Sequence, residues 1–151
     1  MLENKEKLQA ILLMGIPASG KSSFYRETYA GLGVARINLD TLRTRHREQM
    51  LLHECLENHR SFVVDNTNTL PEERARYIAQ ARAAGYEVSG FFFRSCVSEC
   101  MQRNELRENA VPRSAIAAMS NRLILPSYDE GFDHLYFVSL ADGKFCVSDW
   151  I

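Results

Sequence analysis

Short runs rich in apolar residues recur along this chain, and each has the length of one buried strand. They lie at residues 10–14, 34–38, 61–65, 86–93 and 134–138. Runs of this length, bounded by turn residues, are typical of strands that are buried on both faces of a sheet. A shorter run at 145–147 follows Gly143, a spacing that allows a hairpin at the C-terminal end of the sequence.

Between these runs, apolar and charged residues mix in longer stretches that predict helices. The predicted helices cover 22–31, 40–56, 71–84, 95–108 and the stretch between Pro112 and Pro126. Asp40 is placed to cap the second helix, and Pro71 fits the first turn of the third. Strands that alternate with helices predict an α/β fold, a mostly parallel five-stranded sheet with helices on both faces. Without a repeat or linker, residues 1–151 predict one domain.

The first turn of the predicted sheet carries the strongest chemical signal. Gly15-Ile16-Pro17-Ala18-Ser19-Gly20-Lys21-Ser22 fits G-x-x-x-x-G-K-[ST], the phosphate-binding loop between a strand and a helix. Its two glycines allow the backbone to approach phosphate oxygens, which the loop amides then face. Lys21 would reach the β- and γ-phosphates of ATP, and the Ser22 hydroxyl would ligate Mg²⁺. The alternative is a glycine turn without a ligand. The nucleotide contacts predicted here are Gly15, Pro17, Ala18, Ser19, Gly20, Lys21, Ser22 and Ser23.

Ligands of parallel α/β sheets bind beyond the carboxyl ends of the strands, so residues after other strands are expected to face this loop. Asp40 and Arg43 follow the second strand and are three apart, which places them on one helix face. A carboxylate there would take a proton from a substrate hydroxyl while the arginine binds a neighbouring acceptor phosphate. The alternative is that Asp40 only caps the helix and Arg43 is a surface charge.

Two further groups are expected at the same edge. Asp65 ends the third strand, the usual position of an acid near phosphate-bound Mg²⁺, and the alternative is an ion pair with a nearby helix. Thr67, in the polar loop that follows, is predicted with Asp65 to contact the substrate, unless this loop is only a turn. Arg103 and Arg107 are four apart in a charged stretch, which predicts a helical lid over about 95–112. Two arginines over ATP would exclude water and neutralise the transferring phosphoryl group, whereas a solvated arginine-rich helix is the alternative.

Composition narrows these expectations only slightly. The net charge of −1 combines an excess of acids after residue 127 with an excess of arginine before it, so charge neither supports nor excludes a polynucleotide partner. Four scattered cysteines, and histidines without metal-ligand spacing, predict neither a disulfide nor a zinc framework. No apolar run approaches the roughly 18 residues of a membrane span, and residues 1–7 lack the pattern of a signal peptide. We therefore expect a cytoplasmic protein without a membrane partner.

Several motifs occur together in a characteristic order. They are the phosphate-binding loop, Asn38 to Arg43, Val63 to Asn68, Arg103-Asn104 with Arg107, Val111-Pro112, and Pro126 followed by Glu130-Gly131-Phe132. Over about residues 11–138, this set resembles the polynucleotide 5′-kinase family of P-loop phosphotransferases. The resemblance implies ATP-dependent phosphorylation of a 5′-hydroxyl end of DNA or RNA.

The resemblance also implies roles for individual residues. Asp40 looks like the general base of the family and Arg43 like its acceptor-phosphate arginine. Arg107 resembles the catalytic arginine, which Asp65 would orient, and Arg103 would lie nearer the adenine. Leu39 is a departure, because many members carry arginine just before the base, and this bears on the nucleic-acid acceptor more than on kinase chemistry.

The sequence therefore predicts a P-loop kinase that uses ATP and Mg²⁺. Lys21, Asp40 and Arg107 are the predicted catalytic residues, and Ser22 and Asp65 the predicted metal ligands. A 5′-hydroxyl nucleic-acid end is the expected acceptor, and a small hydroxylated metabolite or nucleoside is the alternative. A regulatory module that closes on ATP without transfer is a third hypothesis, which the intact Asp40 disfavours. Protein partners, oligomeric state and the choice between RNA and DNA do not follow from the sequence.

Overall fold

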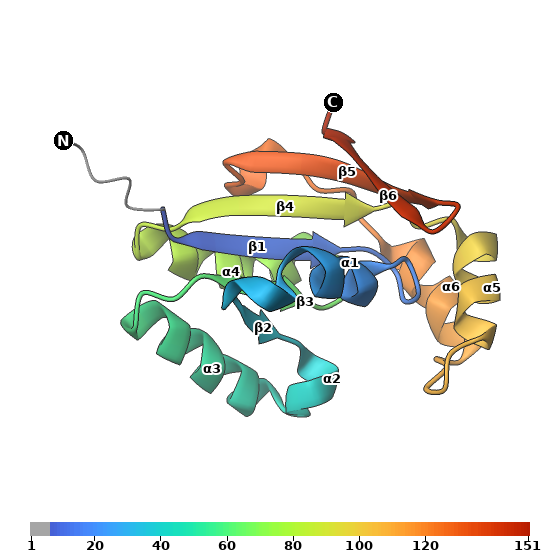
Figure 1. Ribbon diagram of the computed structural model, residues 1–151, viewed down its shortest axis with the longest axis horizontal. Helices are drawn as coiled ribbons and strands as arrows, with labels where there is room; N and C mark the ends of the chain where they lie inside the picture. The colour runs from blue at the N-terminus through green and yellow to red at the C-terminus, as the bar shows by residue number, and fades with distance from the viewer. Residues whose placement is uncertain (1–6) are drawn as a thin grey trace.

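Six strands form one sheet in the order β2-β3-β1-β4-β5-β6, in a computed structural model that describes residues 7–151 (Figure 1). The strands are β1 (Gln9–Met14), β2 (Ala35–Ile37), β3 (Phe62–Asp65), β4 (Glu87–Phe93), β5 (His134–Ala141) and β6 (Lys144–Asp149). Pairing is parallel from β2 to β5, which confirms the predicted mostly parallel sheet. Residues 1–6, on which part of the signal-peptide expectation rests, lie outside the described part.

The prediction of five strands is wrong by one, because β6 pairs with β5 in antiparallel fashion. The turn between them, Asp142-Gly143, has positive φ at both residues (52° and 73°). That backbone suits a tight two-residue hairpin, whose twist matches the flanking strands. The hairpin reaches the phosphate-binding loop, since a Cβ built on Gly20 would lie 3.1 Å from the Phe145 ring.

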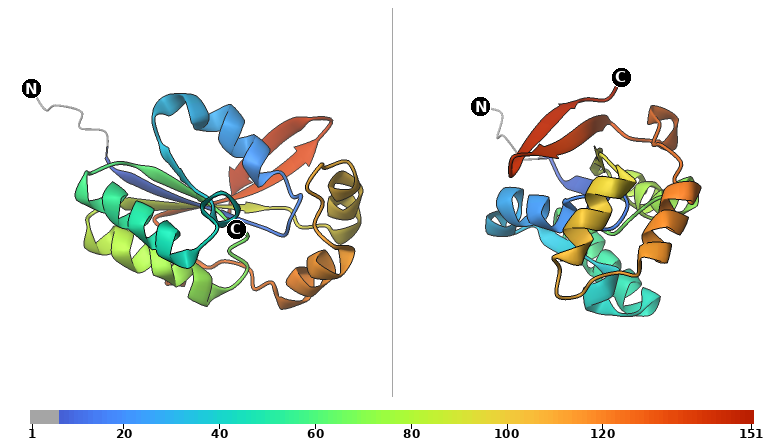
Figure 2. Two further views of the ribbon diagram at one scale, coloured as in Figure 1. Left: turned by 90° about the horizontal axis from the view of Figure 1, so that it is seen from below. Right: turned by 90° about the vertical axis from the view of Figure 1, so that its right-hand side faces the viewer.

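Helices cover both faces of the sheet and its carboxyl end. They are α1 (Lys21–Thr28), α2 (Leu39–Leu42), α3 (Arg45–Glu57), α4 (Pro71–Ala83), α5 (Val97–Glu105) and α6 (Arg113–Arg122), with 3₁₀ turns η1 (Ala30–Leu32) and η2 (Tyr128–Glu130). α1 packs on one face, α3 and α4 pack on the other, and α5 and α6 lie beyond the carboxyl end of the sheet (Figure 2). Among residues 7–151, no helix has the length and apolar character that crossing a membrane requires.

Alternation along β1 divides the apolar core between these layers. Ala10, Leu12 and Met14 pack in the cluster that includes residues of α3 and α4, whereas Ile11 and Leu13 pack with Phe24 of α1. A third buried cluster joins the phosphate-binding loop to the helices beyond the sheet. Its members are Ile16, Cys100 of α5 and Ile116 of α6. The phosphate-binding loop therefore continues from the buried strand β1 and packs against α5 and α6.

The predicted helix 40–56 is two helices, which corrects the assignment of its cap. Asn38, not Asp40, caps the first of them, because its side chain accepts a hydrogen bond from the amide of Thr41. Arg43 then adopts a left-handed conformation (φ 72°), and Thr44 caps α3. The break leaves Asp40 in the first turn of the short helix α2, with its side chain free of capping duty.

An ion pair between a fully buried arginine and a largely buried glutamate fastens the segment before β5 to α4. Arg74 donates from Nε and Nη2 to the two carboxylate oxygens of Glu130, at 2.7 Å and 3.1 Å. Its Nη1 donates to the carbonyl oxygens of Asn68 and Ile124. One guanidinium thus connects the loop after β3, the end of α6 and η2, and so supports the walls of the site described below.

Arg74→Met is expected to lower the free energy of unfolding by about 3–5 kcal/mol, because it leaves the largely buried Glu130 carboxylate without its cation and two carbonyl oxygens without their donor. Urea unfolding followed by circular dichroism measures this change. Arg76→Met is the matched control, since Arg76 lies on the exposed side of the same helix. Equal free energies of unfolding for the two variants would contradict a stabilising role of Arg74.

Candidate active site

The phosphate-binding loop lies between the end of β1 and the start of α1, as predicted. Gly15 has a φ of 154°, and a Cβ there would lie 2.7 Å from Ser19 Oγ and 3.2 Å from the Phe93 carbonyl oxygen. Only glycine fits this position without moving the backbone. The Gly15 amide donates to the Thr67 carbonyl oxygen at 2.9 Å, and the Ile16 amide donates to Ser95 Oγ. The loops after β3 and β4 therefore fix the start of the phosphate-binding loop.

The Lys21 ammonium lies within this loop. Its Nζ donates to the carbonyl oxygens of Gly15 (2.8 Å) and Ile16 (3.0 Å), and it lies 3.4 Å from Ser19 Oγ. Burial lowers the pKa of Lys21 to about 8, against the opposing effect of the Asp65 carboxylate. These hydrogen-bond partners of Nζ are neutral oxygen atoms. A phosphate group bound in the loop would give the Lys21 ammonium an anionic partner.

ATP binding in EDTA is expected to bring proton uptake above pH 8, because phosphate raises the pKa of Lys21 from its value of about 8 in the free protein. Below that pH, Lys21 is already protonated and takes up no proton. Calorimetric titrations at pH 9, in two buffers of different ionisation enthalpy, measure the uptake. An identical binding enthalpy in both buffers would contradict this prediction.

Ser22 and Asp65 supply hard oxygen atoms at the start of α1 and the end of β3. Ser22 Oγ donates to Asp65 Oδ2 at 3.0 Å, and both residues line the same cavity. A hydroxyl and a carboxylate oxygen are ligands that Mg²⁺ prefers, so this pair fits the predicted metal site. Asp65 also binds Arg36 of β2, whose Nη2 lies 2.6 Å from Oδ2.

Arg36 is a site residue that the sequence analysis missed. Ala35 and Ile37 are buried in the α3 and α4 core, so alternation along β2 turns Arg36 to the α1 face. Register places Arg36 opposite Val63. Val63 lies two residues before Asp65, so both are on the same face of β3. Alternation combined with the pairing of the two strands is the signal that could have found it.

Asp40 is held at the cavity by a network that starts on α3 and α4. The Asn66 side chain accepts a hydrogen bond from the amide of Leu39 at 2.8 Å. Its Nδ2 donates to Glu48 and to the Tyr77 hydroxyl, which itself donates to Glu48. Because Glu48 is buried, this network fixes both the Asn66 amide and the start of α2. No local pattern marks Glu48 or Tyr77 as residues of the site.

Different contacts position the two predicted lid arginines near the phosphate-binding loop. Arg103 is on α5 and donates from Nη1 to the Ala18 carbonyl oxygen at 3.0 Å. Arg107 lies beyond the end of α5 at Glu105, so the predicted helix to residue 108 is too long. The Asn104 side chain exchanges two hydrogen bonds with the backbone of Val111, which closes the loop that carries Arg107.

One cavity of about 690 Å³ joins these groups. The predicted site residues that line it are Pro17, Ala18, Gly20, Lys21, Ser22, Ser23, Asp40, Asp65, Thr67, Arg103 and Arg107. Gly15 and Ser19 lie behind them and contact Lys21. Arg43 is exposed and does not line the cavity, so its predicted contact with an acceptor phosphate stays a prediction. Further lining residues include Arg26, Arg36, Asn38, Asn66, Met119 and Leu140.

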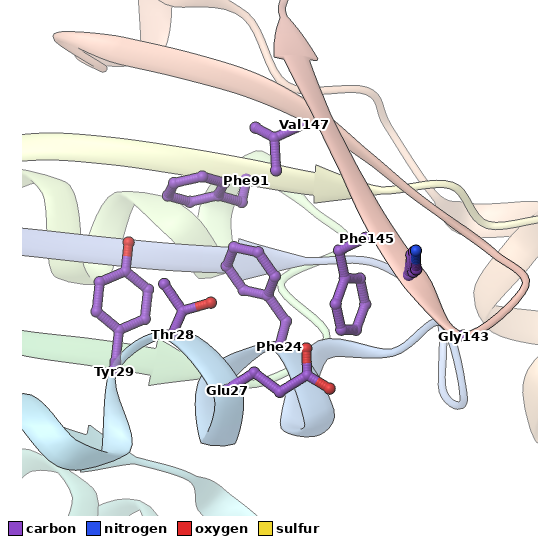
Figure 3. A pocket seen from close by; sticks show the side chains of 9 residues that line it. Phe24, Glu27, Thr28, Tyr29, Phe91, Gly143, Phe145 and Val147 are labelled. Carbon is purple, nitrogen blue, oxygen red and sulfur yellow. The ribbon is translucent and has the colours of Figure 1, made fainter.

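A second hollow, of about 590 Å³, lies between α1 and β6 and is lined mainly by apolar and aromatic side chains (Figure 3). Phe24 contacts Phe91 and Phe145 there, with ring centroids 5.3 Å and 5.4 Å apart. None of the predicted site residues lines it. The chemical groups expected for phosphate transfer therefore gather in the first cavity and not in this one.

Comparison with known families identifies the domain. A family model described as an AAA domain matches residues 11–126. This chain belongs to that AAA domain family. The match begins in β1 and ends after α6, so it contains the phosphate-binding loop, Asp40, Asp65, Arg103 and Arg107.

The AAA domain is also similar to individual proteins. It is 26% identical to a bifunctional polynucleotide phosphatase/kinase of Schizosaccharomyces pombe over 98% of this chain. The chain spans about a third (36%) of the length of that relative. This likeness agrees with the resemblance to polynucleotide kinases read from the motifs.

Solved structures show the same fold at lower identity. Kti12 of Chaetomium thermophilum, in complex with ADP-AlF3, superposes with a TM-score of 0.70 at 18% identity, over 88% of this chain and 90% of that chain. A gluconokinase from Sinorhizobium meliloti 1021 superposes with a TM-score of 0.63 at 20% identity, over 89% and 83%. The AAA domain thus has the α/β P-loop kinase fold that the sequence predicts.

Proposed function

We propose that this AAA domain is an ATP-dependent kinase that transfers the γ-phosphate to a 5′-hydroxyl end of DNA or RNA. The observation that carries the proposal is the single cavity onto which Lys21, Ser22, Asp40 and Arg107 all open. These residues supply the parts of a phosphotransferase: a phosphate-binding cation, a metal ligand, a candidate base and a cation for the transferring phosphoryl group. The relative from S. pombe, with polynucleotide kinase in its name, supports this choice of acceptor.

In the proposed reaction, the phosphate-binding loop and Lys21 hold the β- and γ-phosphates of ATP. The acceptor hydroxyl approaches from the α2 side, where Asp40 accepts its proton as the hydroxyl oxygen bonds to the γ-phosphorus. The bond from that phosphorus to the oxygen of the β-phosphate breaks at the same time, which releases ADP. Arg103 and Arg107 neutralise charge from the opposite side, and the α5–α6 segment excludes water as a lid. Ser22 and Asp65 would hold Mg²⁺, which would supply positive charge that stabilises the negative charge of the phosphates.

A small hydroxylated metabolite or nucleoside is a second candidate acceptor. Leu39 favours it, because this residue lines the acceptor side of the cavity and brings no charge for a polymer backbone. Arg36 and Arg45 also line the cavity. These cations favour the oligonucleotide, because they could bind its phosphates.

An acceptor panel tests the choice. Labelled ATP is supplied with a 5′-hydroxyl oligonucleotide of DNA or RNA, a nucleoside or gluconate, each at two salt concentrations. We expect label on the oligonucleotide, and a steep loss of acceptor affinity with salt because several phosphates are bound. Transfer to gluconate or the nucleoside alone would overturn the nucleic-acid assignment and leave the kinase intact.

A further inference from the structure

Arg36 covers the oxygen atoms that the metal ion would need. Its Nη2 donates to Asp65 Oδ2 at 2.6 Å and to Ser22 Oγ at 3.1 Å, and its Nε donates to the same Oδ2 at 3.0 Å. Together with the hydrogen bond from Ser22, Asp65 Oδ2 therefore accepts three hydrogen bonds. Because the carboxylate is almost fully buried, the guanidinium that contacts it compensates its charge.

The Arg36 guanidinium donates to Ser22 Oγ and Asp65 Oδ2, so its positive charge opposes a divalent cation that approaches the same oxygen atoms. Mg²⁺ binds oxygen atoms with close, nearly octahedral geometry, and Ser22 and Asp65 would supply two of these oxygen atoms. An ion held by Ser22 Oγ and Asp65 Oδ2 would therefore weaken or displace the contacts of Arg36 with these two atoms. The free energy needed to break the contacts of Arg36 lowers the affinity of the site for Mg²⁺.

We propose that Arg36 is a guard cation, which holds Ser22 and Asp65 in place without metal and competes with Mg²⁺ for them. The proposal rests on the proposed function only in taking Ser22 and Asp65 as the metal-binding pair. It assigns Arg36 a positioning role, distinct from the roles of Lys21, Arg103 and Arg107 around the phosphates.

The surroundings of Arg36 allow it to leave. About 30% of its side chain is exposed, whereas Asp65 is about 2% exposed, so the arginine is the partner that can move. Its guanidinium carbon lies 5.4 Å from the centroid of the Tyr25 ring, a favourable contact that does not depend on Asp65. It also lines the cavity, where incoming phosphates offer new negative charge.

The competition has opposite consequences with and without metal. In the absence of Mg²⁺, removal of Arg36 leaves the Asp65 charge unpaired beside the phosphate site, so ATP should bind more weakly. With saturating Mg²⁺, the ion no longer displaces a guanidinium, so ATP should bind more tightly. A residue that simply bound phosphate would weaken ATP binding in both conditions.

The test compares ATP dissociation constants, measured by calorimetry in EDTA and in saturating MgCl₂, for the native chain and Arg36→Met. We expect the ratio of the EDTA constant to the MgCl₂ constant to rise about tenfold, which corresponds to one charge-assisted hydrogen bond. Arg76→Met, an equal loss of charge on the exposed side of α4, should leave the ratio unchanged. An unchanged or lower ratio in Arg36→Met would overturn the proposal.

A second variant keeps the test decisive if Arg36→Met does not fold. Arg36→Lys retains the charge but loses the planar fork that contacts Ser22 and Asp65 together, so we expect a smaller rise in the same ratio. A native ratio in this variant would also count against the guard role. The acceptor is absent from these titrations, so failure of oligonucleotide phosphorylation would overturn the proposed function without changing their outcome.

Discussion

Asp40→Asn is expected to slow phosphate transfer by about 10²–10⁴-fold, the usual contribution of a general base. The amide keeps the shape of the carboxylate but cannot take a proton from the acceptor hydroxyl. The contact that positions α2, from the Leu39 amide to Asn66, involves backbone and is retained. Single-turnover transfer from labelled ATP to a 5′-hydroxyl oligonucleotide measures the effect.

Two controls separate loss of the base from loss of the site. ATP affinity should be unchanged in Asp40→Asn, because the phosphates are held by the loop and Lys21. Asp129→Asn, a charge change at an exposed position of η2, should transfer at the native rate. If Asp40→Asn transfers as fast as the native chain, Asp40 is not the base.

Arg107→Lys is expected to lower the transfer rate by roughly 10³–10⁵-fold, the range for an arginine that stabilises the transferring phosphoryl group. Lysine keeps one positive charge but not the planar set of donors that contacts two phosphate oxygens together. Because the effect falls on the transition state, kcat should fall while the KM for the acceptor stays nearly constant. Steady-state kinetics over a range of acceptor concentrations measures both constants.

Arg122→Lys is the matched control for Arg107→Lys. Arg122 is exposed at the last turn of α6, on the same part of the molecule, and does not line the cavity. We expect native rates from this variant. A rise in KM without a fall in kcat for Arg107→Lys would assign Arg107 to binding of the acceptor rather than to transfer.

The parts of the site that lie within one short segment could be read from the sequence. The phosphate-binding loop is such a segment, because its glycines, Lys21 and Ser22 act through one turn between a strand and a helix. Asp65 could be predicted because it ends an apolar strand, and the carboxyl ends of parallel strands meet at one edge. The same rule predicts that Asp40 faces the phosphate-binding loop, and Asp40 and that loop line one cavity.

The parts built from distant segments could not be read in this way. The pairing of Arg36 with Asp65 depends on which strands are neighbours, and the sheet order places β2 beside β3. Glu48 acts on Asp40 through Asn66, a chain of contacts that joins three elements. The break after α2 was missed because the capping of Asn38 and Thr44 competes locally with the continuous helix that 40–56 predicts.

The central claim is tested most directly by single-turnover transfer to two oligonucleotides that differ only at the 5′ end, one with a hydroxyl and one with a phosphate. The account predicts that the label from γ-labelled ATP appears only on the 5′-hydroxyl strand, on its 5′ oxygen. It also predicts that Asp40→Asn loses this product while it still binds ATP. No label on the 5′-hydroxyl strand, from protein that binds ATP and Mg²⁺, would contradict the account.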